Sequence, residues 1–400
     1  MPERLKMPTN RQLFLSHVAQ TSTAPLMLEI ERANGMYLYD TSGKKYMDLI
    51  AGIAVSNLGH SHPVVVEAIH QQAQKYMHLM VYGEFVQSPQ VAFAKALTTH
   101  LPASLNNVYF TNSGAEATEG AMKLAKRYTG RTEIISFKKA YHGSTQGALS
   151  IMGDEYFKQK FRPLLPDTRQ LTYNDEAGLQ HITTRTAAVI VEVVQAESGV
   201  NPGTQTFITQ LRQRCTETGT LLIFDECQTA LGRTGRLWGF EHYGVIPDVM
   251  LLAKALGGGM PLGAFVASQH IMSSLSDKPV LGHITTFGGH PVCCAAGLAA
   301  FNQLVGGALI EEVETKGKLF EVLLQHRLIK AVRRKGLMLA VEFDSYEQNK
   351  RIIDRCIENG VLTDWFLFAP NCLRIAPPLI ISEEEIRTAC AVILSAAEQE

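Results

Sequence analysis

Lys254 is the residue of this chain whose neighbours most favour covalent chemistry. It follows the apolar run Val-Met-Leu-Leu-Ala and precedes Ala-Leu-Gly-Gly-Gly-Met. Burial among apolar side chains disfavours the charged form of an ammonium group, and a neutral lysine amine is a nucleophile. Such lysines form Schiff bases with carbonyl compounds, pyridoxal 5'-phosphate (PLP) among them. The surroundings of Lys254 therefore predict a Schiff-base lysine, whereas an isolated lysine in such a run more often caps a helix or lies on the surface.

Asp225 ends a second apolar run, Leu-Leu-Ile-Phe, which is typical of a short buried strand. A carboxylate in that position is suited to keeping the pyridine nitrogen of PLP protonated, which is the partner this cofactor needs. The alternative is that Asp225 only begins a turn. Taken together, Asp225 and Lys254 predict a PLP site.

Three segments in order carry a family resemblance: Ile-Phe-Asp-Glu-Cys-Gln-Thr-Ala-Leu-Gly-Arg-Thr-Gly at 223–235, Pro-Asp at 247–248, and Ala-Lys-Ala-Leu-Gly-Gly-Gly-Met-Pro-Leu-Gly-Ala at 253–264. They closely resemble the class III PLP-dependent aminotransferases, the group of the acetylornithine, ornithine and 4-aminobutyrate aminotransferases. The likeness extends over almost the whole chain. It implies the type I fold of PLP-dependent transferases and amino-group transfer by a ping-pong mechanism, with Lys254 and Asp225 as catalytic residues.

The segment Thr111-Asn-Ser-Gly-Ala-Glu-Ala lies where a predicted strand ends and a helix begins. Small residues let backbone N–H groups approach an anion there, and a helix N-terminus favours negative charge. An ordinary helix start with a capping box between Ser113 and Glu116 fits the same residues. The resemblance assigns the phosphate of PLP to Ser113, Gly114 and Ala115.

The resemblance adds further residues to the cofactor site. Tyr141, followed by His142, would stack on the pyridine ring, and Gln228 would bond the ring hydroxyl. Thr286 would reach across a dimer interface to the phosphate of the partner. Without the resemblance Tyr141 would be a core residue and Thr286 a plain loop residue. The implied assembly is a homodimer with composite active sites.

Two charged residues are suited to a substrate carboxylate. Arg374 lies in Leu-Arg-Ile-Ala-Pro-Pro, and a guanidinium group binds a carboxylate through two parallel hydrogen bonds. The resemblance assigns Arg374 to the α-carboxylate of 2-oxoglutarate or glutamate. It also implies that Glu197 pairs with Arg374 while the other substrate is bound, although the residues around Glu197 depart from the common family motif.

Ser144 is the departure that bears most on the substrate. Acetylornithine-type members usually carry an arginine directly after the Tyr-His-Gly element, where it binds a substrate carboxylate, and a hydroxyl cannot replace that charge. We expect an amine or ω-amino acid donor (ornithine-, acetylornithine- or 4-aminobutyrate-like) and 2-oxoglutarate as acceptor. The alternatives are an aminomutase of the glutamate-1-semialdehyde type and, in another class, a catalytically silent PLP-binding or regulatory protein.

Composition excludes several other functions. Lys and Arg number 37 and Asp and Glu 38, so no basic surface for nucleic acid is indicated. The sequence contains no run of 18 apolar residues, so no membrane span is expected. The N-terminus does not resemble a signal peptide. The seven cysteines form no Cys-x-x-Cys, which favours a reduced, cytoplasmic protein. His60 and His62 have no evident third ligand nearby, so no metal is expected.

Strand-like and helix-like runs alternate from about 105 to 265, which is typical of an α/β fold with a mostly parallel sheet covered by helices. The predicted strands are 107–111, 132–137, 187–194, 221–224 and 249–252, and the predicted helices are 115–129 and 207–218. A helix at 311–324, a strand at 336–343 and a helix at 382–400 indicate a smaller α+β domain. We expect a large PLP-binding domain at 49–290, a C-terminal small domain at 291–400, and an N-terminal segment, 1–48, packed with it.

Overall fold

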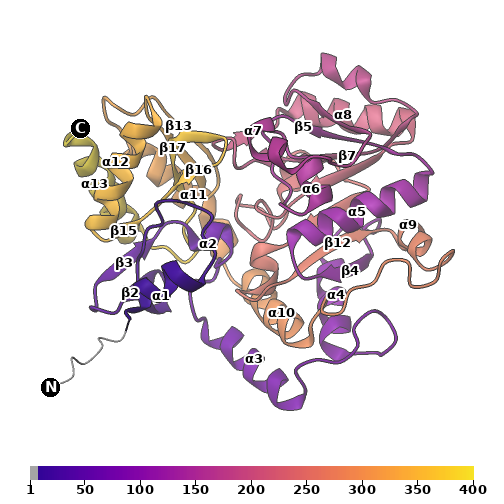
Figure 1. The fold of residues 1–400 in the computed structure, drawn as a ribbon, viewed down its shortest axis with the longest axis horizontal. Helices are drawn as coiled ribbons and strands as arrows, with labels where there is room; N and C mark the ends of the chain where they lie inside the picture. The colour runs from indigo at the N-terminus through magenta and orange to yellow at the C-terminus, as the bar shows by residue number, and fades with distance from the viewer. Residues whose placement is uncertain (1–7) are drawn as a thin grey trace.

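A seven-stranded sheet lies at the centre of the larger part of the molecule (Figure 1). In the computed structural model, which describes residues 8–400, its strand order is β4-β12-β11-β10-β7-β5-β6. The strands are β4 (Asn107–Thr111), β5 (Glu133–Phe137), β6 (Thr168–Leu171), β7 (Thr186–Glu192), β10 (Leu221–Asp225), β11 (Val249–Leu252) and β12 (Gly263–Ala267). Only β12 runs antiparallel to its neighbours in this sheet, so the predicted, mostly parallel sheet is confirmed.

Both faces of this sheet are covered, which explains why its central strands β10 and β11 are continuous apolar runs rather than alternating ones. On β10, Ile223 packs with α5 (Gly114–Thr129) in one apolar cluster. Leu222 and Phe224 point to the opposite face, into a cluster with α8 (Gln205–Thr218), α4 (Ser88–Thr99) and α10 (Pro291–Gly306). The helices predicted at 115–129 and 207–218 are confirmed as α5 and α8.

Two four-stranded sheets form the other part of the molecule, on the left of Figure 1. One has the order β13-β14-β17-β16 and the other β1-β2-β3-β15. Their strands are β1 (Ile30–Asn34), β2 (Tyr37–Asp40), β3 (Lys45–Asp48), β13 (Ala331–Lys335), β14 (Met338–Glu342), β15 (Val361–Leu362), β16 (Trp365–Phe366) and β17 (Ala369–Ile375). Because β3 pairs in parallel with β15, the N-terminal strands share a sheet with a C-terminal one. The division at 48/49 and 290/291 stays a prediction.

The remaining helices are mostly short. The predicted C-terminal elements are confirmed as α11 (Leu309–Leu323), β14 and α13 (Glu383–Glu398). The other helices are α1 (Asn10–His17), α2 (Ala51–Ala54), α3 (Pro63–Lys75), α6 (Gln146–Ser150), α7 (Glu155–Lys158), α9 (Gln269–Met272) and α12 (Tyr346–Glu358). Single turns of 3-10 helix are η1 (Gln159–Phe161), η2 (Ala177–His181), η3 (Gly239–His242), η4 (Lys254–Gly257) and η5 (Ser273–Leu275), and β8 (Val194–Gln195) pairs with β9 (Asn201–Pro202).

The strand predicted at 187–194 is shorter than expected. Strand β7 ends at Glu192, and the separate two-residue strand β8 begins at Val194.

No single helix in the range 8–400 is long and apolar enough to cross a membrane. Helices α10 and α11 pass that test only as a pair, by length and composition, across a bend of 74°.

Candidate active site

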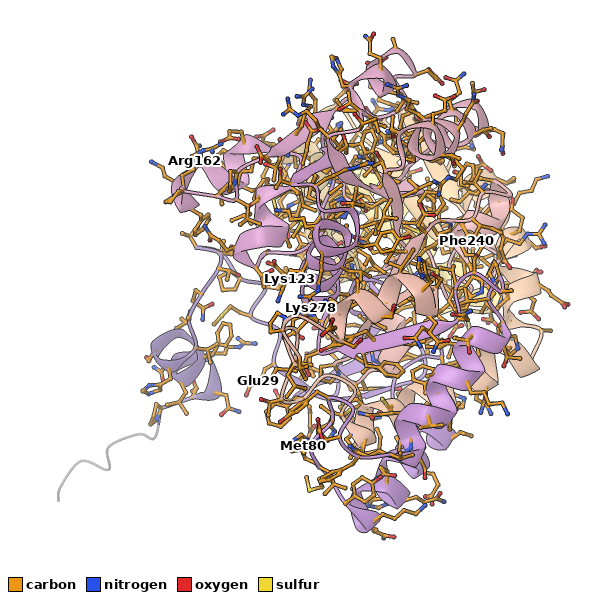
Figure 2. The ribbon with its side chains drawn as sticks, turned by 90° about the vertical axis from the view of Figure 1, so that its right-hand side faces the viewer. Glu29, Met80, Lys123, Arg162, Phe240 and Lys278 are labelled. Carbon is orange, nitrogen blue, oxygen red and sulfur yellow. The ribbon has the colours of Figure 1, made fainter. Side chains whose placement is uncertain are left out.

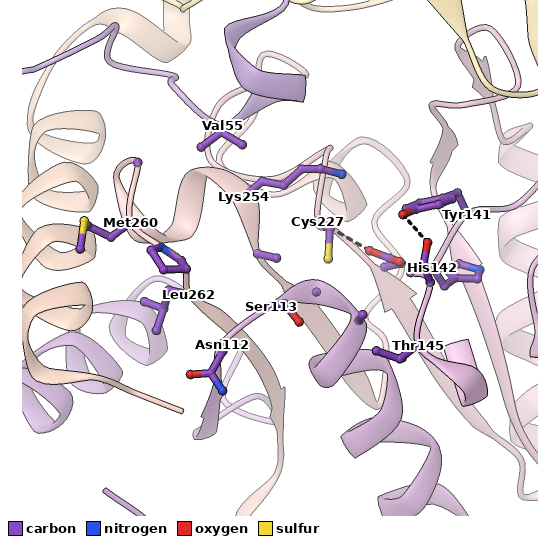
Figure 3. Close-up of a pocket in the computed structure, with 18 residues that line it drawn as sticks. Val55, Asn112, Ser113, Tyr141, His142, Thr145, Cys227, Lys254, Met260 and Leu262 are labelled. Carbon is purple, nitrogen blue, oxygen red and sulfur yellow. Dashed lines mark hydrogen bonds and ion pairs between the residues drawn. The ribbon is translucent and has the colours of Figure 1, made fainter. Parts of the chain in front are cut away.

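The carboxyl ends of several strands in the seven-stranded sheet open into one cavity of about 770 Å³ (Figure 3). Strand β10 ends at Asp225, Lys254 follows β11, and Ser113 follows β4. The cavity is lined by residues 55, 112–115, 141–145, 225, 227, 253–254 and 259–262. Ligands of α/β sheets bind at such strand ends. Three segments far apart in the sequence therefore contribute to one site.

Lys254 begins η4 immediately after β11, and its backbone φ is 53°. This left-handed conformation is uncommon for a residue with a side chain, and such strained residues cluster at functional sites. The apolar neighbours of Lys254 predicted a buried side chain, but the structure shows it half-buried. No hydrogen bond or ion pair joins its amine to the other residues that line the cavity (Figure 3). The amine is therefore open to a carbonyl compound that enters the cavity.

The buried carboxylate of Asp225 is hydrogen-bonded by two groups. The Nδ1 atom of His142 lies 2.7 Å from its Oδ2, and the backbone N–H of Cys227 donates to its Oδ1 at 3.0 Å. Burial alone would raise the pKa of Asp225, but the hydrogen bonds from His142 and Cys227 hold it below its ordinary value. Asp225 thus presents a negative charge to the cavity, as needed to keep a pyridine nitrogen protonated.

The start of α5 differs in one detail from the capping box considered from the sequence. Ser113 Oγ accepts from the Glu116 N–H at 3.2 Å, as expected. The Glu116 carboxylate, however, accepts from the N–H of Asn112 at 2.7 Å, one residue before Ser113, so the box is not formed. The N–H groups of Gly114 and Ala115, in the first helical turn, have no intrahelical acceptor. Because both residues line the cavity, this helix start is suited to a phosphate.

Gly143 allows the segment after Tyr141 to approach that helix start. Its φ is +126°, and a Cβ atom built there would lie 2.6 Å from the Cβ of Ala115. Tyr141 lines the cavity and packs against an apolar cluster that includes Phe368. Its backbone N–H donates to Glu192 at 3.3 Å. Tyr141 is thus held at the wall of the cavity by this packing and by its backbone hydrogen bond.

Glu192 is a site residue that the sequence reasoning missed. It lies opposite Asp225 in the register of β7 and β10. Burial, followed by the nearby charge of Asp225, raises the pKa of Glu192 well above its ordinary value. The pKa values of these two neighbouring carboxyl groups are therefore shifted in opposite directions, that of Asp225 downward and that of Glu192 upward. An acidic residue inside the otherwise apolar run 187–194 was the signal that could have revealed it.

Glu197 and Arg374 form a buried pair outside the lining of this cavity. The Nη1 and Nη2 atoms of Arg374 donate to the two oxygens of Glu197 at 2.9 and 3.0 Å. Gln228 donates to Glu197 at 3.3 Å, and so does the backbone N–H of Leu367 at 3.1 Å. Burial would raise the pKa of Glu197, but Arg374 holds it below the ordinary value. The pair that the resemblance implies for one substrate is therefore formed here.

Asp364 is a second carboxyl group beside Arg374 that the sequence reasoning missed. Its Oδ1 lies 2.9 Å from Nε of Arg374, but the N–H does not point at the oxygen, so the contact is an ion pair without a hydrogen bond. Burial raises the pKa of Asp364 to about 6 despite the opposing effect of Arg374. Arg374 therefore lies between two acidic side chains.

Thr286 lies away from the cavity, in the loop between η5 and α10. Its side chain is exposed, and it is not among the residues that line the cavity. The loop is fixed at its neighbour Thr285, which accepts a hydrogen bond from the Asn112 side chain at 3.2 Å.

Within residues 8–400 no three His, Cys, Asp or Glu residues are grouped as metal ligands, and His60 bonds Asp48 at 2.8 Å.

Comparisons with known proteins agree with this geometry. Residues 18–397 match the model of the class-III aminotransferase family. The acetylornithine aminotransferase of Caldanaerobacter subterraneus is 40% identical over 384 residues, which cover 92% of this chain and 94% of the relative. The crystal structure of the ornithine aminotransferase from Toxoplasma gondii is 30% identical, covers 99% of this chain and 96% of that one, and superposes with a TM-score of 0.91. Another structure of the T. gondii enzyme, with the same identity and TM-score and covering 99% of this chain and 95% of that one, has PLP at partial occupancy in its active site.

Proposed function

Because the chain belongs to the class III aminotransferases, which are PLP-dependent enzymes, we propose that its cavity holds PLP and that Arg374 receives the 2-oxo acid acceptor, 2-oxoglutarate. The observation that carries the proposal is that Lys254 and Asp225, from the ends of two adjacent strands, open into the same cavity. A primary amine and the 2-oxo acid give an aldehyde or ketone and an amino acid, so atoms and electrons balance without a further reactant.

The residues of the cavity fit PLP. The unpaired N–H groups at the start of α5 suit its phosphate, and Tyr141 faces the space for the ring. When bound, PLP supplies the electron sink that allows a donor carbon to lose a proton. Asp225, bonded by His142, would keep the ring nitrogen protonated. Gln228, three residues after Asp225, donates to Glu197 at 3.3 Å in this structure and would bond the ring hydroxyl when the cofactor is present.

Lys254 has two tasks in this proposal. Its amine would hold the cofactor covalently between turnovers. The same amine, once free, would accept the proton that the donor carbon loses and pass it on. The absence of a competing hydrogen bond to Lys254 within the cavity supports both tasks (Figure 3). His142 contributes by orientation, since one ring nitrogen bonds Asp225 and the other, Nε2, is buried without a partner among the described residues.

Glu197 and Arg374 allow one site to serve two substrates. Glu197 bonds the guanidinium group of Arg374 at 2.9 and 3.0 Å in this structure, and in the proposal it keeps that pairing while the amine donor is bound. When the 2-oxo acid enters, its α-carboxylate takes the place of Glu197 on Arg374. Gln228 and the N–H of Leu367 each keep a hydrogen bond available to the displaced Glu197 carboxylate. Asp364 keeps an ion pair with Nε of Arg374 throughout.

We also propose that two copies of this chain form a homodimer with Thr286 at the interface. Large apolar side chains of that loop are exposed, among them Ile284 and Phe287. Helix α1, which buries none of its residues, stands clear of the body of the chain (Figure 2). Sedimentation analysis is expected to give twice the mass of one chain, and a monomer at micromolar concentration would contradict this assembly.

The seven free cysteines support a reducing compartment, the cytoplasm.

The amine donor is tested by a panel assay. The protein, loaded with PLP, is incubated with 2-oxoglutarate and one of several amines, and the glutamate formed is measured. Glutamate formation with at least one amine supports the proposal, whereas conversion of a single amino aldehyde without any 2-oxo acid would indicate an aminomutase of the glutamate-1-semialdehyde type. The relatives are aminotransferases and do not favour that alternative.

A further inference from the structure

At Ser144 and Thr145 the mouth of the cavity carries hydroxyl groups rather than cations. Ser144 and Thr145 line it and are exposed, and the hydroxyls of Tyr141 and Ser144 lie 3.2 Å apart. Lys254 is the only lysine or arginine among the residues that line the cavity, and it comes from another segment. The Ser144 side of the cavity thus offers no positive charge to a substrate carboxylate.

A carboxylate lies directly behind this mouth. Thr145 Oγ1 donates to Oε1 of Glu119 at 2.7 Å, and the N–H groups of Gly147 and Ala148 donate to the same oxygen at 2.8 and 3.1 Å. The partners of Glu119 in the described part of the chain are thus a hydroxyl and two amides, with no lysine or arginine among them. Its negative charge is therefore not neutralised by an ion pair.

The hydrogen bond to Glu119 also decides what Thr145 can offer to a ligand. A hydroxyl has one hydrogen and two lone pairs. Because the hydrogen of the Thr145 hydroxyl points to Glu119, its oxygen has only lone pairs left for a ligand. This oxygen is then an acceptor for an N–H group and repels another carboxylate oxygen. Ser144 lies next to it and adds a second oxygen.

We propose that this mouth binds a second ammonium group, and that the amine donor is an α,ω-diamine. The inference rests on the proposed function, since it takes the cavity to be the donor site. One end of the diamine reaches Lys254, and the other donates hydrogen bonds to Thr145 and Ser144 in front of Glu119. The reacting end loses its amino group and becomes an aldehyde as the 2-oxo acid becomes an amino acid. The distal ammonium is unchanged.

The test compares amines that differ only at the distal end. Putrescine carries an ammonium there, butylamine a methyl group and 4-aminobutyrate a carboxylate. The donor half-reaction of the PLP-loaded protein, followed spectroscopically without any acceptor, is expected to be at least about tenfold more efficient (rate constant over dissociation constant) with putrescine than with butylamine. It is expected to be least efficient with 4-aminobutyrate. N-acetylornithine, which carries a carboxylate, is included as the donor of the relatives.

Two variants assign the preference to this mouth. Glu119→Gln removes the charge and keeps an acceptor oxygen, and Thr145→Val removes the hydroxyl and keeps the branched shape. Each is expected to lower the ratio of donor efficiencies, putrescine over butylamine, by about threefold to fivefold. A change of this size corresponds to the interaction free energy of one exposed charge pair. Glu217→Gln, on the exposed surface of α8, removes one charge elsewhere and is expected to leave the ratio unchanged. Because a ratio is compared, partial misfolding does not imitate the effect.

A binding measurement gives a readout that does not depend on turnover. Calorimetric titration of the Lys254→Ala protein, reconstituted with PLP, is expected to show the same preference for putrescine over butylamine. A preference for 4-aminobutyrate or N-acetylornithine over putrescine, or an unchanged ratio in both mouth variants, would overturn the diamine inference alone. Failure of every amine to convert the bound cofactor would overturn the proposed function itself.

Discussion

Replacing Arg374 by lysine should damage one half of the reaction and spare the other. The guanidinium group bonds both oxygens of Glu197 at 2.9 and 3.0 Å, and Nη2 also donates to the carbonyl of Trp365 at 3.0 Å. A single ammonium group cannot reproduce the two parallel hydrogen bonds to a carboxylate. A hydrogen bond to a charged group contributes about 1.5 to 3 kcal/mol. Losing one of the two should slow the 2-oxoglutarate half-reaction roughly tenfold to hundredfold.

Single-turnover spectra separate the two halves. The amine half-reaction is measured by mixing the PLP-loaded protein with donor alone, and the acceptor half-reaction by mixing the aminated form with 2-oxoglutarate. We expect Arg374→Lys to change the first by less than about threefold, because Arg374 is then paired with Glu197 rather than with substrate. Arg334→Lys is a matched control, since Arg334 also contacts two carboxylates, Glu314 and Glu321, each at 2.8 Å, and lies away from the cavity. Equal slowing of both halves by Arg374→Lys would refute an acceptor-specific role.

Three further changes test other parts of the account. Asp225→Asn should keep the fold and the bound cofactor but lower turnover by orders of magnitude, because the ring nitrogen loses its charged partner; a near-normal rate with PLP bound would assign that task to another group. Ser144→Arg should add binding of N-acetylornithine and weaken binding of the native amine, measured as KM for each donor; a wild type that already prefers N-acetylornithine with an ordinary KM would contradict the reasoning. Burial raises the pKa of Glu226 from 4.5 to about 7, so its contribution to stability is complete below about pH 4.5 and falls as the pH rises to about 7. Glu226→Gln should remove that pH dependence in denaturant unfolding, and an unchanged slope between pH 4.5 and 7 would count against it.

The sequence predicted the elements of the large sheet well because the strands are buried on both faces. The run at 249–252 is continuous and apolar, and the structure has a strand at the same residues. The same pattern placed Asp225 and Lys254 at strand ends, so their shared cavity followed from the parallel topology. The roles assigned to these side chains stay proposals that the variants above test.

Other features of the site depend on tertiary contacts that no local pattern records. Asp364 faces Arg374 because β16 folds back onto β17, which brings together residues ten positions apart. The pKa of Glu192 is raised by burial and by the charge of Asp225, beside which the register of two strands places it. The exposure of Lys254 was misjudged because apolar neighbours in the chain point into the sheet, while Lys254 itself follows the strand and faces the cavity.

The central claim is that Lys254 holds the cofactor covalently. The most direct test is to load the protein with PLP, reduce it with borohydride, digest it and locate the modified residue by mass spectrometry. The account predicts a pyridoxyl group on Lys254 and on no other lysine, and its loss in the Lys254→Ala protein. A modification on another lysine, or a Lys254→Ala protein that still turns over at the wild-type rate, would contradict it.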